Sequence, residues 1–213
     1  MPKKTKKNRS MLQKGSGAKA KTHDDERKAI GSMSHGDQRF YFFWKTASPF
    51  SQWHPSRYER NGVVFSCAEQ GMMHSKALLF QDTEMAQQIL ETNHPRTIKA
   101  LGRKVRSFHP TVWNQHRERI VYDHTVSKFT QNPHLCQALL DTQGRRLVEA
   151  SPNDSIWGIG LSEAAAKRMP SDQWPGLNLL GNILTRVRHE MSPGSLLVQN
   201  DEGVNEGVNE KKK

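Results

Sequence analysis

Apolar residues recur at helical spacing through most of the middle of the chain. The segments with this pattern are 67–80, 82–91, 94–101, 109–132, 133–140, 162–169 and 178–191. Steps of three and four residues place the apolar side chains on one face of a helix, which can then pack against a core. The segment 109–132 fits one long helix or two shorter ones. The pattern therefore predicts a predominantly helical domain.

Three shorter segments have the composition of strands. Residues 40–45 (FYFFWK) are aromatic, and 144–151 (GRRLVEAS) contain a short apolar run. Residues 57–66 (RYERNGVVFS) place the turn dipeptide Asn61-Gly62 between two short strands, which predicts a hairpin. We expect an α+β fold, a single compact domain of about seven helices with a small antiparallel sheet, rather than a βαβ repeat.

Two charged residues lie on the apolar face of the helix predicted at 67–80. At 100° per residue, Lys76 falls about 20° from Glu69, and Met72 and Met73 flank the pair. Charged groups on a core-facing stripe are costly unless they are paired or line a pocket. Seven residues rise about 10 Å along a helix, which is long for a direct ion pair. This pattern predicts a polar ligand held between Glu69 and Lys76 in a shared cavity.

Each of these two residues also has a simpler interpretation. Ser66 and Glu69 fit the S-x-x-E capping box, in which the glutamate only closes the first turn of the helix. Lys76 could extend its ammonium group to water across the methionines. Gly71 falls on the outer face of the same helix.

The segment 147–160 (LVEASPNDSIWGIG) is the second candidate for a site. Asp154 follows the turn after a strand, and Trp157 is flanked by Gly158 and Gly160 in a glycine-rich loop. Glycine allows a close approach of the backbone, and a tryptophan beside such a loop can stack on a base. The alternative is a tight core turn in which Trp157 packs and Asp154 forms an Asx turn.

Other candidate positions are single residues. Arg103 follows Gly102 and can clamp a phosphate or form a surface ion pair. Trp113 fits either a ligand platform or a core position. His74, His116 and His124 are expected to be exposed on helices. The chain has ten histidines but no HExxH or CxxC motif, so no metal site is predicted.

Charge is distributed unevenly along the 213 residues. The formal net charge is +11, and ten Lys or Arg against three Asp or Glu give residues 1–36 a charge of +7. This segment lacks apolar periodicity and is expected to be a disordered basic leader. It fits a solvated segment, a nuclear-import signal or a contact with nucleic acid. Residues 37–192 are the expected domain, and 193–213 an expected disordered tail with the echo EGVNEGVNE.

The cellular compartment is constrained by composition. Two cysteines are too few for a disulfide framework, which favours a reducing environment. The chain has no apolar run of the roughly 20 residues that a membrane span needs. We therefore expect an intracellular protein of the cytoplasm, or of the nucleus if the Lys-rich leader is an import signal. The sequence predicts no oligomeric state.

Taken together, the motifs resemble those of the YbiA-like, or NADAR, proteins, in family order over about residues 40–190. The resemblance rests on SPFSQW (48–53), AEQGMMHSKALLF (68–80), KALGRKVRSF (99–108), the W-N-x-x-R-x-x-I-V stretch from Trp113, KFTQN (128–132), LVEASPNDSIWGIGL (147–161) and GLNLLGNILTRVR (176–188). Gln52 stands where the family has Asn, and Gly71 where it has an aromatic residue. These departures bear on the choice of substrate.

The resemblance implies an N-glycosidase with a compact, mainly helical fold and no cofactor. Members of the family cleave riboflavin-pathway ribosylamine phosphates or remove ADP-ribose from guanine. By the resemblance, the residues on the family's pocket motifs are Glu69, Lys76, Trp113, Asp154 and Trp157. We predict catalytic roles for Glu69, Lys76 and Asp154, and substrate-binding roles for Trp113, Trp157, Arg103, Gly158, Trp53 and Phe50. Glu69, near a helix N-terminus, is expected to be an ionised base, and Lys76 an amine of lowered pKa that attacks C1′. The alternative is a non-catalytic module that binds ADP-ribose or a nucleotide, tethered to nucleic acid by the basic leader.

Overall fold

A computed structural model describes residues 39–192 of the chain. All of them belong to one compact unit. The predicted leader (1–36) and tail (193–213) lie outside the described residues. The strands are β1 (Phe40–Phe43), β2 (Tyr58–Arg60), β3 (Val63–Phe65) and β4 (Arg146–Glu149). The helices are α2 (Ala68–Leu79), α3 (Thr83–Leu90), α4 (Pro95–Gly102), α5 (Pro110–Thr130), α6 (Pro133–Leu140), α7 (Glu163–Ala166) and α8 (Leu179–Met191), with a 3-10 turn at Ser171–Gln173.

The described part has the predicted fold class. Its seven α-helices begin and end close to the positions expected from the sequence, and residues 110–130 form one continuous helix. Pro95, Pro110 and Pro133 each occupy the first position of a helix, where the missing N–H has no intrahelical partner to lose. Proline therefore marks the start of three helices in the sequence.

The strands form two separate pairs. β2 and β3 make the predicted antiparallel hairpin, with Asn61 at φ 52° and Gly62 at φ 77°, the left-handed conformation that this tight turn needs. β1 pairs with β4 in parallel, with Phe40 opposite Arg146 and Phe43 opposite Glu149. Strands in parallel need a long crossover, and the helices α2 to α6 lie between these two. The sequence did not indicate this second pairing.

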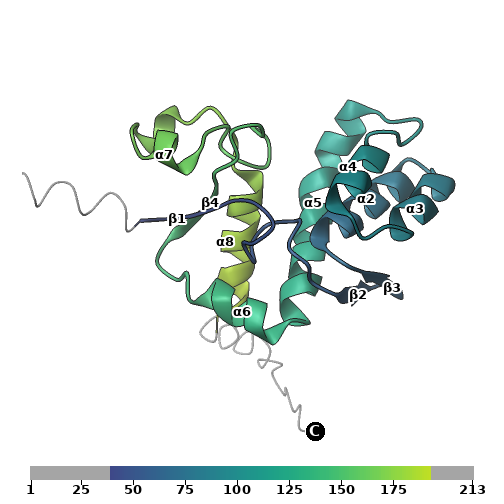
Figure 1. The fold of residues 1–213 in the computed structure, drawn as a ribbon, viewed down its shortest axis with the longest axis horizontal. Helices are drawn as coiled ribbons and strands as arrows, with labels where there is room; N and C mark the ends of the chain where they lie inside the picture. Colours follow the sequence, from purple (N-terminus) through teal and green to yellow (C-terminus); the bar gives the residue numbers. More distant parts are fainter. Residues whose placement is uncertain (1–38, 193–213) are drawn as a thin grey trace, which may run out of the picture. The chain divides into compact units, whose positions relative to one another are not determined.

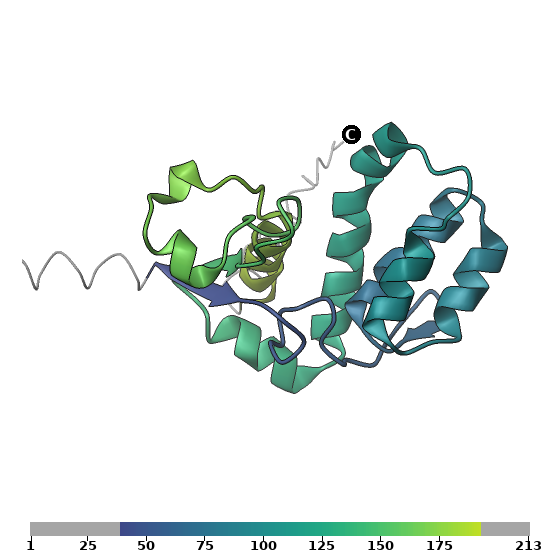
Figure 2. The ribbon, with the colours of Figure 1, turned by 45° about the horizontal axis from the view of Figure 1, so that its top comes forward.

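The helices pack in two groups around α5. Figures 1 and 2 show α2, α3 and α4 on one side of this long helix and α8 with β1 and β4 on the other. The core between them consists of fully buried apolar side chains, including Ala77, Ile89, Ile98, Val121, Phe129, Leu139, Leu147 and Val187. Helix α2 contacts α3, α4 and α5, so its residues are fixed from three sides.

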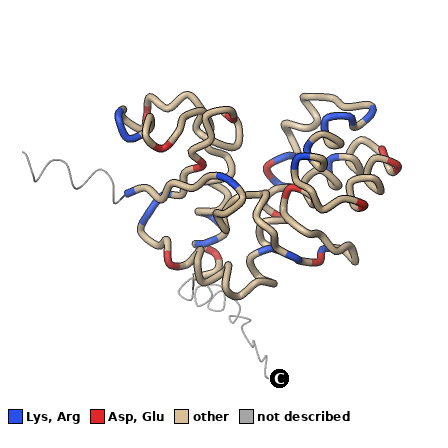
Figure 3. Tube along the Cα trace, in the orientation of Figure 1, with Lys and Arg blue, Asp and Glu red and all other residues tan. Residues whose placement is uncertain are grey.

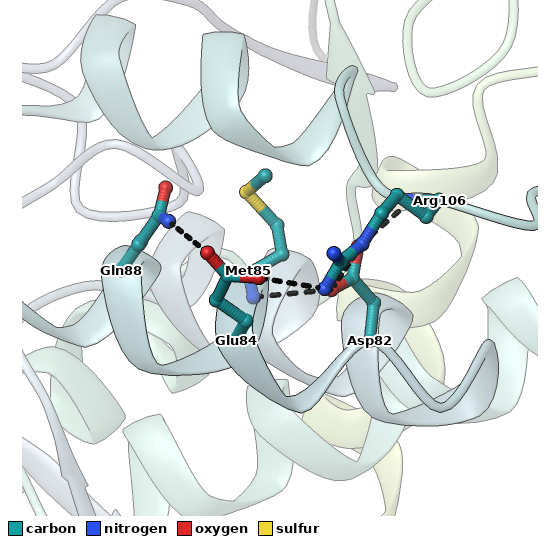
Figure 4. A network of polar contacts seen from close by, with 5 residues as sticks. All are labelled: Asp82, Glu84, Met85, Gln88 and Arg106. Carbon is teal, nitrogen blue, oxygen red and sulfur yellow. Dashed lines mark hydrogen bonds and ion pairs between the residues drawn. The ribbon is translucent and has the colours of Figure 1, made fainter.

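A polar network fixes the segment that follows α4 (Figure 4). Asp82 caps α3 by accepting a hydrogen bond from the Met85 N–H at 3.2 Å. The same carboxylate accepts from the backbone N–H of Arg106 at 2.8 Å and pairs with the Arg106 guanidinium, which also contacts Glu84 at 3.0 Å. The Arg106 hydrogen bonds hold the pKa of Asp82 at about 2. The segment after α4 is thereby tied to the start of α3.

Two of the histidines expected on the surface are buried. His124 is 2% exposed, and its ring nitrogens contact the Tyr58 hydroxyl at 3.0 Å and the Ser75 hydroxyl at 2.7 Å. His74 is buried too, whereas His116 is exposed as expected. Gly71 faces this cluster rather than the surface, and any side chain there would collide with Tyr58 and His124. The hairpin and α5 cover this face of α2, which periodicity within one helix cannot reveal.

Candidate active site

A cavity of about 840 Å³ opens between the two groups of elements. Its wall is formed by segment 44–53, the first turns of α2, one face of α4 and the segment from the end of β4 to Trp157. Five of the predicted site residues line it: Trp53, Glu69, Arg103, Asp154 and Trp157. Met72 and Met73 supply apolar wall. The cavity thus combines carboxylates, cations and aromatic rings.

Glu69 is the buried carboxylate of this cavity. It lies at the second position of α2, is 4% exposed, and its backbone N–H donates to the Gln52 carbonyl at 2.9 Å. Its Oε1 is buried without a hydrogen-bond partner among the described residues. Burial raises the pKa of Glu69 to about 7, although Lys99 and a hydrogen bond from Trp53 act in the opposite direction. Desolvation thus acts against the helix N-terminus, which favours the ionised form that the sequence predicted for Glu69.

The capping-box interpretation of Glu69 is wrong. Gln70, not Glu69, reaches back to Ser66: its Oε1 accepts hydrogen bonds from the Ser66 N–H at 2.7 Å and the Ser66 hydroxyl at 3.0 Å. The Gln70 amide nitrogen donates to the carbonyls of Ile89 and Thr92, so it also ties α2 to the end of α3. Glu69 is left available to the cavity.

One face of α4 supplies cations to the cavity. Arg96, Lys99 and Arg103 follow one another at steps of three and four residues, and all three line the cavity. The Lys99 Nζ lies 5.9 Å from the centre of the Trp53 ring. Lys99 also lowers the pKa of both Glu69 and Glu149, which places its charge near these two carboxyl groups. Only Arg103 was identified from the sequence, although the helical spacing was a sufficient signal for the other two.

Asp154 forms the Asx turn that was one of the two interpretations of this segment, and it is also positioned at the cavity. Its Oδ1 accepts hydrogen bonds from the backbone N–H groups of Ile156 at 3.0 Å and Trp157 at 2.8 Å, which is an Asx turn. The residue also lines the cavity, as does Trp157. Gly158 does not: a Cβ there would lie 2.8 Å from the Glu149 carbonyl oxygen. The backbone of Gly158 therefore lies close to the end of β4, and the glycine is needed for this contact rather than for a ligand.

A third carboxyl group, on Glu149, was missed. Glu149 ends β4 and lines the cavity, and its Oε2 is buried without a partner in the described part of the chain. Burial raises its pKa to about 8, and the nearby Asp154 and Glu69 act in the same direction. An acidic residue directly after the buried pair Leu147-Val148 was the available signal.

Three other predicted site residues lie outside the cavity wall. Phe50 is a core residue, 2% exposed, in ring contact with Tyr41, Phe43 and Phe129. The Lys76 Nζ donates to the Gly102 carbonyl at 2.7 Å and lies 5.6 Å from the Trp113 ring, which packs against the core. Burial lowers the pKa of Lys76 in the predicted direction. The shared cavity expected for Glu69 and Lys76 is wrong, because the lysine side chain turns toward the end of α4.

Residues 39–192 contain no group of three or more His, Cys, Asp or Glu side chains placed to hold a metal ion. None of its helices has the length and apolar character needed to cross a membrane. Figure 3 shows Lys and Arg distributed over both groups of elements rather than along one.

Comparison with known proteins places the chain in a family. Residues 41–192 match the NADAR domain. An N-glycosidase of Acanthamoeba polyphaga mimivirus is 47% identical over 146 residues, which cover 66% of this chain and 86% of the viral protein. The chloroplastic riboflavin biosynthesis protein PYRR of Zea mays is 32% identical over 52% of this chain and 17% of its own length.

A solved structure confirms the fold. The NMR structure of the E. coli protein YbiA superposes with a TM-score of 0.61 at 22% identity, covering 79% of this chain and 90% of YbiA. The domain match and the N-glycosidase relatives identify this protein as a hydrolase of N-glycosyl bonds. The chain belongs to the NADAR domain family.

Proposed function

We propose that this enzyme removes a base or amine from a ribose that carries a phosphate or pyrophosphate, with Glu69 beside the reacting carbon. The supporting observation is the unpartnered Oε1 of Glu69 in the same cavity as the three cations of α4. Ribosylamine phosphates of the riboflavin pathway and ADP-ribose on guanine both have this chemistry. The riboflavin biosynthesis protein among the relatives supports the first of these.

The carboxylate fits the charge that develops in the reaction. Cleavage of a ribosyl C1′–N bond builds positive charge on C1′ and the ring oxygen, and a nearby carboxylate stabilises it. A group of pKa about 7 is ionised in a large fraction of molecules at neutral pH. Glu69 can therefore also take a proton from the attacking water.

The rest of the cavity suits the two ends of such a substrate. We assign the phosphate or pyrophosphate to Arg96, Lys99 and Arg103, because guanidinium and ammonium groups bind phosphate oxygens through charge-assisted hydrogen bonds. The rings of Trp53 and Trp157 are the stacking surfaces for the leaving base. Asp154, whose Oδ1 is held in the turn, faces the ribose in this arrangement.

Lys45 and Lys99, rather than Lys76, are the amines that line the cavity. Lys76 supports α4 through the Gly102 carbonyl. A non-catalytic binding module has no need for two buried, unpartnered carboxyl oxygens beside its ligand, and this speaks against the alternative. We place the enzyme inside the cell, in keeping with its two free cysteines.

A side-by-side hydrolysis assay tests this proposal. The full chain is incubated with ADP-ribosylated guanosine and with a riboflavin-pathway ribosylamine phosphate, and each also without its phosphate groups. We expect release of the free base or amine from at least one phosphorylated compound and slower release from its unphosphorylated counterpart. Equal rates with and without phosphate, or hydrolysis of neither phosphorylated compound, would contradict the proposal.

A further inference from the structure

The backbone of Glu149 is held firmly at the edge of the cavity. Its N–H donates to the Asn178 Oδ1 at 2.9 Å, and its carbonyl accepts from the Ile159 N–H at 3.0 Å. The preceding residues Leu147 and Val148 are fully buried, and the parallel pairing places Glu149 opposite Phe43. The carboxyl group is therefore presented to the cavity from a rigid strand end rather than from a loop.

Glu149 has a polar atom without a partner. Its Oε2 is buried and makes no hydrogen bond within residues 39–192. Glu69 has the same feature at Oε1, and both side chains line one cavity. Buried polar atoms are almost always paired in proteins, so two such atoms at one site point to a ligand that pairs with them.

The charges around the two glutamates favour the protonated form of Glu149. Asp154 and Glu69 both raise the pKa of Glu149, which burial alone already raises, while Lys99 lowers it. The other charged groups that line the cavity are Lys45, Arg96 and Arg103. Two nearby carboxyl groups that disfavour each other's ionisation divide into an acid and a base, as in other hydrolases with paired carboxyls. A hydrogen bond from Trp53 and the charge of Arg103 favour the ionised form of Glu69, and neither acts on Glu149. Glu149 is therefore the member of the pair that keeps the proton.

We propose that Glu149, in its protonated form, is the general acid that delivers a proton to the leaving nitrogen. The assignment rests on the proposed function. The hydroxyl of the protonated carboxyl needs an acceptor, and a ring or amine nitrogen of the leaving group is one. The neutral carboxyl also adds no charge beside Asp154.

The step balances with these residues and water alone. The oxygen of water forms a bond to C1′ as the C1′–N bond breaks. The electron pair of that bond stays on the nitrogen, which takes the proton from Glu149. Glu69 accepts the proton that the attacking water loses. Glu149 then regains a proton, and Glu69 releases one, through solvent in the open cavity.

The test is the pH profile of kcat/KM for wild type and Glu149→Gln on the phosphorylated substrate that wild type hydrolyses. Glutamine keeps the size and a donor but transfers no proton. We expect wild-type activity to fall above about pH 8 and Glu149→Gln to lose about 100- to 10,000-fold together with this alkaline limb. The exposed Glu59→Gln is the matched control and should keep the wild-type profile.

Two results would overturn the assignment. One is Glu149→Gln with wild-type turnover and an intact alkaline limb. The other is a wild-type rate that stays constant from about pH 7 to 10, which decides the matter even if the variant fails to fold. If wild type hydrolyses neither phosphorylated substrate, the proposed function itself is wrong and the general-acid role fails with it. An active wild type beside an unaffected variant removes only the role of Glu149.

Discussion

The side-chain nitrogen of Lys76 donates a hydrogen bond to the carbonyl oxygen of Gly102 at 2.7 Å, and this contact ties α2 to the last turn of α4. The same nitrogen lies 4.3 Å from the centre of the Phe108 ring. A cation at a helix C-terminus and over an aromatic face is stabilised by both. Since the next residue, Arg103, lines the cavity, Lys76 acts on the site by fixing α4.

We predict that Lys76→Met lowers stability more than catalysis. The lost hydrogen bond leaves the Gly102 carbonyl without this donor, which costs about 1–3 kcal/mol in the free energy of unfolding. Turnover should stay within about tenfold of wild type. Borohydride added during turnover, followed by peptide mapping, should leave Lys76 unlabelled. A ribosyl adduct on Lys76, with activity lost in the variant, would restore the sequence-based hypothesis of a Lys76 nucleophile.

For α2, the sequence predicted the position of the helix better than the direction of its side chains. Helical spacing correctly placed α2 and identified Glu69 as a charged residue on a buried face. It did not show that Lys76, on the same face, turns toward α4, because that depends on where α4 packs. The parallel pairing of β1 with β4 was not predicted for the same reason, because strand partners far apart in sequence leave no local signal. The acidic residue after Leu147-Val148 was a signal in the sequence, but its place at the cavity follows only from the packed structure.

The cations of α4 should act on substrates that carry phosphate. Lys99→Met removes a charge that lines the cavity, and a charge-assisted hydrogen bond contributes about 1.5–3 kcal/mol, so KM should rise about tenfold or more. The matched control is Lys104→Met, an exposed lysine that follows the same helix. The comparison is made on a phosphorylated substrate and its unphosphorylated counterpart. An equal loss on both would show that Lys99 does not bind the phosphate.

We predict that Lys128 anchors the backbone of the segment that carries Gln52 and Trp53. It is 2% exposed, and its Nζ donates to the carbonyls of Pro49 at 2.6 Å and Ser51 at 3.0 Å. Lys128→Met leaves both carbonyls without these hydrogen bonds, at a cost on the order of 3 kcal/mol in the free energy of unfolding. Denaturant unfolding and KM for the substrate are the measurements. An unchanged midpoint with unchanged KM would refute this anchoring role.

The two cavity glutamates should make the protein less stable as pH rises. Their folded pKa values, about 7 for Glu69 and about 8 for Glu149, exceed the ordinary 4.5, so the native state binds more protons than the unfolded state between these limits. The contribution of these two carboxyls to the free energy of unfolding is complete below about pH 4.5. It is lost as pH rises through 7 and 8. Lys128, whose pKa burial lowers to about 7, acts in the opposite direction at higher pH.

The effect of the carboxyls is isolated by the difference between a variant and wild type. The double variant Glu69→Gln/Glu149→Gln cannot ionise at these positions. We compare the melting temperature of the variant minus that of wild type at pH 8.5 and at pH 5. We expect this difference to be more positive at pH 8.5, because only wild type must ionise buried carboxyls there. A difference that is constant between the two pH values would show that neither carboxyl has a raised pKa.

The most direct test of the account is the single-turnover rate of C1′–N cleavage in Glu69→Gln, with Glu59→Gln as the matched control. The Glu69 variant removes the carboxylate beside C1′ but keeps the shape of the side chain. We predict that its cleavage rate falls about 100- to 10,000-fold while the protein stays folded and still binds the phosphorylated substrate. A Glu69→Gln enzyme that cleaves the bond at the rate of Glu59→Gln would contradict the claim that Glu69 drives the reaction.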